Sequence, residues 1–304
     1  MPFFDKAQKV LAPNQSESTV DRYLSLLKKA LLNELNPELE ARLVALAHSV
    51  LTRDPLDLRE LTGIRETEWP KLIREVREEG WAIEMKERLP DGRVIPRRDL
   101  RFLSEGAHTM MGRKRLDHLH ACLETVCREG VPGDFIETGV WRGGGTVFMR
   151  GFLAAHGITD RVVWVADSFE GLPPPTLSQD AGWDLSKEAW PSLAVGLAEV
   201  KELFERYDLL DDRVRFLKGW FRDTLPTAPI VELAVLRLDG DLYESTMDAL
   251  ESLYDKVAPG GYVIVDDYKA VAPCEVAVEE FRKRRGIRAD MSFIDSAATF
   301  WRKP

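Results

Sequence analysis

Four carboxylates stand directly after two apolar runs in the second half of this chain. Asp239 directly follows "LAVLRL", and Asp241 lies two residues further on. Asp266 and Asp267 directly follow "GYVIV". If these runs are neighbouring parallel strands, the four acids meet at one edge of a sheet and repel one another unless a cation lies between them. An all-oxygen cluster of this kind suits Mg²⁺ or another hard divalent cation. Turns and helix caps could explain single acids, but they explain the whole set poorly.

A glycine-rich turn lies earlier, in "DFIETGVWRGGGT" at 134–146. Glu137 belongs to the apolar run, and Gly139 and Gly143 lie in the turn that follows it. Glycines let backbone approach a ligand closely, and a helix that begins after them offers free N–H groups. The pattern is neither GxGxxG nor a phosphate-binding GK[ST] loop. A tight strand-to-helix turn without a ligand is the alternative interpretation.

Two further strand ends supply candidate binding residues. Asp167 and Ser168 follow "RVVWVA", and an acid at this point of a doubly wound fold accepts two hydrogen bonds from ribose hydroxyls. A helix N-cap is the alternative role for Asp167. Gly219 and Trp220 follow "RVRFLK", where the indole could form a wall against a purine ring or pack in the core. No HExxH or GxSxG motif is present, and His108 is the one histidine near the start of this half.

The elements that must position these residues alternate regularly after residue 107. Apolar runs without clean alternation, typical of strands buried on both faces, predict strands at 135–140, 161–167, 213–219, 232–239 and 261–267. Helical patterns lie at 113–129, 145–156, 187–207, 243–257 and 274–285, and 291–302 could be a strand that closes the sheet. This order predicts an α/β protein with a doubly wound, mostly parallel sheet and ligands at the carboxyl ends of its strands.

The first hundred residues are predicted to be mainly helical. "LPDGRVIP" at 89–96 is typical of the turn of a small hairpin. Apolar residues recur at helical spacing with charges on the opposite face, which indicates amphipathic helices that need a partner surface. The three stripes are Tyr23, Leu27, Leu31; then Leu39, Leu43, Leu46, Val50; then Trp69, Leu72, Ile73, Val76.

Composition excludes several classes of function. The chain has 304 residues, 44% of them hydrophobic, and a net charge of -9, which argues against a nucleic-acid binder. We interpret local basic patches such as Arg97-Arg98 as solvated surface. No apolar segment is long enough for a signal peptide or a membrane span. Three cysteines without a CxxC pattern predict neither a disulfide framework nor a zinc site, so a cytoplasmic location is expected.

Several segments together resemble the macrocin O-methyltransferase (TylF-type) family. They are "HTMMGRKRLDHL" (108–119), "DFIETGVWRGG" (134–144), "DSFEGLP" (167–173), "LLDDRVRFLKGWFRDTLP" (209–226), "LRLDGDLYEST" (236–246) and "GGYVIVDDY" (260–268). The resemblance implies a bacterial S-adenosylmethionine- and Mg²⁺-dependent O-methyltransferase that acts on sugar hydroxyls of antibiotics and related natural products. It also implies a class I, Rossmann-like sheet of seven strands, the last antiparallel, within 107–304. Residues 1–106 would then form a helical region that covers the acceptor, makes oligomer contacts, or both.

The resemblance also implies roles for individual residues. Asp239 would act as general base. Arg142 would meet a carboxylate, either of the cofactor or of the protein. The cofactor would contact Thr109, Met110, Glu137, Gly139, Arg142, Gly143, Asp167, Ser168, Gly219 and Trp220, and the metal would be held by Asp239, Asp266 and Asp267.

Other classes of protein remain as alternatives. A catechol- or phenol-type O-methyltransferase would use the same metal chemistry on an aromatic acceptor. A nicotinamide-dependent oxidoreductase would share the sheet but is expected to carry GxGxxG, and a noncatalytic scaffold is expected to have lost some metal carboxylates. We therefore expect a small glycosylated acceptor, no nucleic-acid or membrane partner, and a homo-oligomer of two or more chains.

Overall fold

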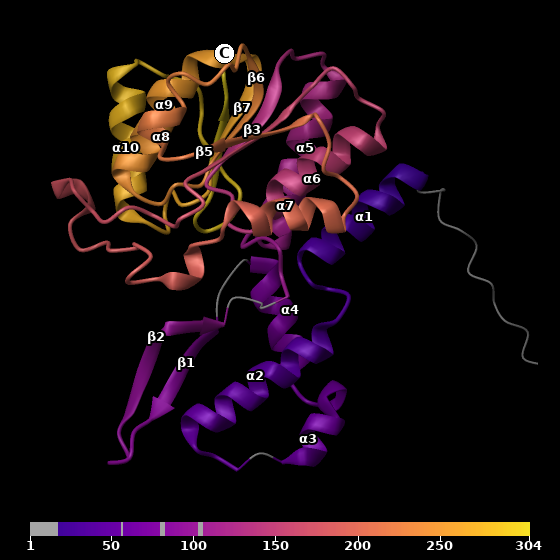
Figure 1. The fold of residues 1–304 in the computed structure, drawn as a ribbon, viewed down its shortest axis with the longest axis vertical. Helices are drawn as coiled ribbons and strands as arrows, with labels where there is room; N and C mark the ends of the chain where they lie inside the picture. Colours follow the sequence, from indigo (N-terminus) through magenta and orange to yellow (C-terminus); the bar gives the residue numbers. More distant parts are fainter. Residues whose placement is uncertain (1–17, 56, 80–82, 103–105) are drawn as a thin grey trace, which may run out of the picture.

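The computed structural model describes residues 18–55, 57–79, 83–102 and 106–304. Figure 1 shows two parts: a sheet with helices on both faces, and a smaller part at one end of that sheet that contains α2, α3, α4 and a hairpin. Within the described ranges, no helix combines the length and the apolar character needed to cross a membrane.

Seven strands form the large sheet, in the order β5-β4-β3-β6-β7-β9-β8. The five parallel strands are β3 (Asp134–Thr138), β4 (Val163–Asp167), β5 (Val214–Lys218), β6 (Leu233–Leu238) and β7 (Val257–Val265). At the far edge, β9 (Thr299–Arg302) runs antiparallel to β7 and to the two-residue β8 (Ser292–Phe293). The predicted mostly parallel sheet is confirmed, although the single strand expected at 291–302 is two short strands joined by a turn.

The order of the strands determines which edge of the sheet can bind a ligand. β3 lies in the middle of the sheet, and the chain then builds β4 and β5 on one side of it and β6 and β7 on the other. The order reverses between β3 and β6, and such a switch point leaves a crevice at the carboxyl ends of the strands. The acids predicted from the sequence come directly after these ends.

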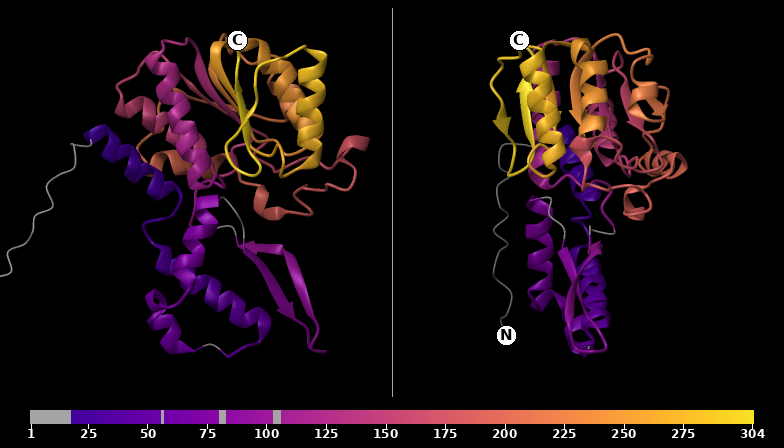
Figure 2. Two further views of the ribbon diagram at one scale, coloured as in Figure 1. Left: turned by 180° about the vertical axis from the view of Figure 1, so that it is seen from behind. Right: turned by 90° about the vertical axis from the view of Figure 1, so that its left-hand side faces the viewer.

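Helices cover the two faces of the sheet (Figures 1 and 2). α1 (Thr19–Leu31), α5 (Arg113–Arg128), α6 (Gly144–Ala155) and α7 (Leu197–Arg206) share one apolar cluster with the sheet, which contains Phe148 and Phe204. α8 (Phe221–Thr224), α9 (Tyr243–Leu253) and α10 (Ala272–Arg284) share the other, which contains Phe281. The helix predicted at 187–207 begins only at Leu197, because residues 187–196 form an irregular segment with a 3-10 turn at Pro191–Leu193.

The smaller part contains α2 (Pro37–Thr52), α3 (Leu58–Thr62), α4 (Trp69–Glu79) and the antiparallel strands β1 (Ile83–Arg88) and β2 (Val94–Phe102). The hairpin expected around 89–96 is present. In α1, Leu27 and Leu31 are buried while Tyr23 is 38% exposed, and in α4 Ile73 is buried while Leu72 is 38% exposed. The side chain of Val76 lies outside the described ones.

The second predicted stripe does not pack as expected. α2 buries Ala41 and Val44 against Ile64 and Ile73. The stripe itself points to solvent along its whole length: its exposed fractions are 60%, 42%, 39% and 76% at Leu39, Leu43, Leu46 and Val50.

Candidate active site

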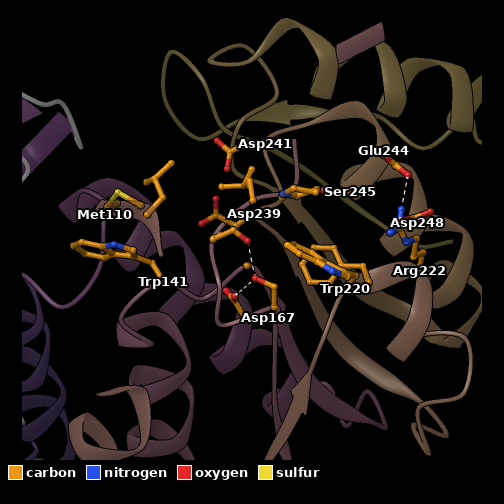
Figure 3. Close-up of a pocket in the computed structure, with 18 residues that line it drawn as sticks. Met110, Trp141, Asp167, Trp220, Arg222, Asp239, Asp241, Glu244, Ser245 and Asp248 are labelled. Carbon is orange, nitrogen blue, oxygen red and sulfur yellow. Dashed lines mark hydrogen bonds and ion pairs between the residues drawn. The ribbon is translucent and has the colours of Figure 1, made fainter. Parts of the chain in front are cut away.

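A pocket opens at the switch point and takes its walls from several strand ends (Figure 3). Met110 and Trp141 stand on one side, Trp220 stands on the other, and Asp167 and Asp239 lie between them. The pocket holds about 780 Å³, its open mouth included. A ligand bound there would touch residues from several strand ends at once.

A buried guanidinium joins the ends of β3 and β6. Arg237 and Glu137 are directly paired across these strands, so their side chains point to the same face. The Nη1 of Arg237 donates to Glu137 Oε1 at 2.6 Å and to Asp239 Oδ2 at 2.7 Å. Its Nη2 donates to Asp266 Oδ1. The Arg237 side chain is 2% exposed, so its buried charge offsets part of the negative charge of the carboxylate cluster.

Three of the acids form a group with the geometry of a cation site. Carboxylate oxygens of Asp239, Asp241 and Asp267 lie within 4.8 Å of one another. Burial and the neighbouring Asp239 raise the pKa of Asp241 to about 7. Burial, together with the surrounding aspartates, also raises the pKa of Asp267 well above its usual range. Among the described residues, Oδ2 of Asp267 has no hydrogen-bond partner.

Asp266 is placed differently. One carboxylate oxygen accepts from Arg237 and the other from Arg115 on α5. Arg115 also donates to Asp295 Oδ2 at 2.6 Å, in the turn between β8 and β9. In this geometry Asp266 balances two guanidinium groups, while its neighbour Asp267 faces Asp239 and Asp241.

The glycine-rich turn is shaped by close backbone contacts. Gly139 has a φ of +87°, and a Cβ at this position would lie 1.7 Å from the Asp239 carbonyl oxygen. A Cβ on Gly145 would lie 2.5 Å from Glu137 Oε1, so the glutamate carboxylate rests against the start of α6. Burial raises the pKa of Glu137 to about 8 despite the nearby Arg237. Gly143, with a φ of +90°, forms the N-cap of α6.

Asp167 lines the pocket and is held by backbone. Its Oδ2 accepts from Val140 N at 2.8 Å, and its Oδ1 accepts from Phe169 N at 2.7 Å. Ser168, which also lines the pocket, donates to the Gly171 carbonyl at 2.6 Å. Each carboxylate oxygen can accept a second hydrogen bond, so Asp167 keeps capacity for a ligand diol.

Three other predicted residues, Thr109, Arg142 and Gly219, are not among the residues that line this pocket. Thr109 is buried, and its hydroxyl accepts from Met111 N at 3.1 Å. The Arg142 guanidinium stacks 4.3 Å from the Trp141 ring and donates to the Ala107 carbonyl. Gly219 ends β5 with a φ of +137°.

His108 lies beside this pocket rather than in it. Burial and Arg142 lower its pKa to about 4, and its Nδ1 lies 2.9 Å from the Tyr207 hydroxyl. A neutral, buried ring in this position is consistent with a structural role.

The structure brings together six of the predicted residues as pocket walls: Met110, Gly139, Asp167, Ser168, Trp220 and Asp239. Sequence reasoning missed Arg237 and Arg115, although the need for a cation among the acids pointed to such a residue. It assigned no role to Arg222, Glu244 and Asp248, which also line the pocket.

The sequence model of the family described as Macrocin-O-methyltransferase (TylF) matches residues 20–303. The chain belongs to this family. The predicted family resemblance and the class I methyltransferase fold are thereby confirmed, and the chain is an O-methyltransferase by family.

Individual relatives agree with this assignment. The chain is 58% identical over 198 residues to an 8-demethyl-8-(2,3-dimethoxy-alpha-L-rhamnosyl)-tetracenomycin-C 4'-O-methyltransferase of Streptomyces olivaceus, covering 64% of this chain and 76% of the relative. It is 52% identical over 202 residues to a mycinamicin III 3''-O-methyltransferase of Micromonospora griseorubida, covering 65% and 79%.

Solved structures extend the likeness over more of the chain. The O-methyltransferase NovP superposes with a TM-score of 0.71 at 41% identity, covering 93% of this chain and 99% of that one. A calicheamicin methyltransferase, 17% identical with a TM-score of 0.53 and 94% coverage of both chains, shares the fold.

Proposed function

We propose that this TylF-family enzyme transfers a methyl group from S-adenosylmethionine to a sugar hydroxyl of a glycosylated natural product, with help from a divalent cation. The observation that carries the proposal is the group of half-buried aspartates at the switch point, beside a pocket that also exposes Asp167. The named relatives act on a rhamnosyl tetracenomycin and on mycinamicin III, which supports a glycosylated acceptor. Residues 107–304 would perform the reaction, and residues 1–106 would cover the acceptor, contact other subunits, or both.

The cofactor is proposed to lie along the strand ends. Asp167 accepts hydrogen bonds from the ribose hydroxyls, and Trp220, with Gly219 beside it, stands where an adenine ring would stack. Gly139 and Gly143 let the methionine part approach the N-terminus of α6, where Glu137 supplies negative charge for its ammonium. Thr109, Met110 and Arg142 would line the other side of the bound cofactor.

Two observations support the binding of a hard divalent cation by these acids. Carboxylates outnumber the guanidinium groups of Arg237 and Arg115 here, and one oxygen of Asp267 has no partner among the described residues. Asp239 and Asp267 would be ligands, and the third oxygen would come from Asp266, as the family resemblance implies, or from Asp241, as the grouped oxygens favour. A bound Mg²⁺ would orient the acceptor oxygens and favour the alkoxide.

Asp239 is the proposed general base. Its side chain is 27% exposed, so it can reach the pocket, whereas Glu137 is buried behind it. Arg237 fixes one of its oxygens at 2.7 Å and leaves the other to take the proton of the acceptor hydroxyl. As that proton moves to Asp239, the new C–O bond forms and the C–S bond of the sulfonium breaks. Trp141 and Trp220 line the pocket, and their rings would limit the access of water once the ligands are bound.

The first experiment is calorimetric titration of the full chain with S-adenosylhomocysteine, with and without Mg²⁺. Micromolar binding is expected, and absence of binding in both conditions would refute the proposed cofactor site. Methyl transfer from deuterium-labelled S-adenosylmethionine is then followed by mass spectrometry on a panel of rhamnosylated polyketides, macrolides and catechols. Label on a sugar oxygen supports the proposal, and label found only on catechols would identify the phenol-type alternative.

Asparagine variants assign the metal ligands. Asp239→Asn is expected to abolish most turnover while S-adenosylhomocysteine still binds, and full activity would refute its role. Mg²⁺ titration of Asp241→Asn and Asp266→Asn decides the third ligand, since only the variant that lacks a true ligand loses metal affinity strongly.

A further inference from the structure

The turn at residues 239–242, which joins β6 to α9, carries two of the clustered aspartates, Asp239 and Asp241 (Figure 3). Asp241 has a φ of +54°, in the left-handed region that residues other than glycine seldom adopt. Leu242 N donates to the Gly240 carbonyl at 2.6 Å, which closes the turn tightly. A backbone in this conformation persists only where the surrounding structure holds it.

The N-terminus of α9 is capped from a distant part of the chain. Its N-cap residue, Leu242, has an apolar side chain and makes no side-chain cap. The carboxylate of Asp180 replaces that cap: Oδ1 accepts from Tyr243 N at 2.7 Å, and Oδ2 accepts from Glu244 N at 3.2 Å. Asp180 is completely buried, and its negative charge lies where the N-terminus of a helix favours an anion.

Asp180 belongs to residues 171–196, the segment between β4 and α7. Four residues of this segment line the pocket: Gly171, Leu172, Pro173 and Leu193. A 3-10 turn at Ser178–Asp180 places the capping carboxylate. A second contact joins the same parts of the chain, because Thr176 Oγ1 donates to Glu244 Oε2 at 2.9 Å. The segment and the turn at 239–242 are therefore fixed to each other through the start of α9.

We propose that Asp180 is a positioning residue for the aspartate cluster. By capping α9, it holds the turn at 239–242 in one shape. In that shape, carboxylate oxygens of Asp239, Asp241 and Asp267 lie within 4.8 Å of one another. Asp180 is not among the residues that line the pocket, so it acts through the backbone of α9 and not by contact with a ligand. Its effect on cation binding rests on the proposed function, whereas its effect on the turn does not.

Hydrogen–deuterium exchange of the full chain, resolved to single amides, tests the hold on the turn. In Asp180→Ala the amides of Tyr243 and Glu244 lose their acceptor, so we expect them to exchange at least tenfold faster than in the wild type. Asp184→Ala is the matched control, because Asp184 lies in the same segment and accepts from Ser186 N at 3.0 Å, within that segment. The two α9 amides should exchange at the wild-type rate in this control. Unchanged exchange of both amides in a folded Asp180→Ala would overturn the proposal.

Metal affinity tests the consequence for the aspartates. Binding of Mn²⁺ to the full chain is followed by the loss of the electron paramagnetic resonance signal of the free ion. Asp180→Ala should weaken binding about tenfold, which corresponds to about 1.4 kcal/mol and is typical of a lost helix cap. Asp180→Asn keeps one oxygen as an acceptor for the α9 amides and should weaken binding only about threefold. Asp184→Ala should bind Mn²⁺ as the wild type does.

A purely structural role of Asp180 gives a different result. Asp180→Ala would then unfold at a lower temperature but, while folded, would bind Mn²⁺ with wild-type affinity, and this result would overturn the proposal. If Asp180→Ala does not fold, Asp180→Asn decides in the same two measurements. A wild type that binds no Mn²⁺ would refute the proposed metal site, and the exchange rates of the α9 amides then decide alone whether Asp180 holds the turn.

Discussion

Replacement of Arg237 by methionine tests whether one guanidinium holds the acidic edge of the sheet together. Arg237 donates charge-assisted hydrogen bonds to Glu137, Asp239 and Asp266 and is nearly inaccessible to water. Removing one partner of a buried ion pair costs about 3–5 kcal/mol, because it leaves the other charge buried without compensation. A domain is stabilised by only about 5–15 kcal/mol in total, so the folded Arg237→Met protein should be markedly weakened.

The pH dependence distinguishes this cause from lost packing. Without Arg237, protonation is the remaining way to neutralise Glu137, so its folded-state pKa rises further above its unfolded value. Burial already raises the pKa of Glu137 from 4.5 to about 8. A group with a raised folded pKa gives up stability as the pH rises past its unfolded value. Between the unfolded pKa and about pH 8 the wild type loses this stability as well, so the deficit of Arg237→Met relative to the wild type should grow above about pH 8, where Glu137 ionises in the folded wild type but not in the folded variant.

Urea unfolding followed by tryptophan fluorescence in EDTA at pH 6, 8 and 9.5 measures this deficit. Arg150→Met is the matched control, because Arg150 pairs with Asp211, whose side chain is 39% exposed. Its loss should cost about 1 kcal/mol or less. The pKa of Asp211 is already lowered by Arg150, so the control deficit should not grow between pH 6 and 9.5. An Arg237→Met deficit that is absent at pH 9.5, or equal at pH 6 and 9.5, would refute the reasoning.

Three shorter predictions concern the pocket. Gly139→Ala should weaken S-adenosylhomocysteine binding more than tenfold in calorimetry, because the new Cβ would collide with the Asp239 carbonyl; near-normal affinity would contradict this. At pH 7 the same titration should release protons, since the ligand ammonium favours ionised Glu137, and equal apparent enthalpies in Tris and phosphate would disprove the linkage. Trp141→Phe keeps the aromatic wall but removes the indole hydrogen bond to the Ser192 carbonyl at 2.9 Å. Stopped-flow measurements should then show roughly fivefold faster ligand release, which corresponds to the loss of about 1 kcal/mol from one hydrogen bond. An unchanged rate would show that this hydrogen bond does not slow ligand release.

The sequence alone predicts most of the catalytic half. Apolar runs too uniform to be half-exposed strands indicate a parallel sheet, and the residues after them must then share an edge. That reasoning located Asp167, Asp239 and the turn at Gly139 correctly at the pocket. It placed one helix start ten residues too early, because the segment before Leu197 has a helical pattern that the turn at Pro191–Leu193 interrupts.

Only the tertiary structure showed which arginine side chains each acid contacts. The sequence shows that Arg237 and Asp239 lie on the same face of one strand, but the strand register is needed to bring that face against Glu137. It also shows an apolar stripe on α2 without saying what covers it. Periodicity defines the faces of a helix or strand locally, whereas the neighbour of each face depends on contacts between distant segments. For that reason the cluster of acids could be predicted, while the buried arginine between them and the solvent-facing leucines of α2 could not.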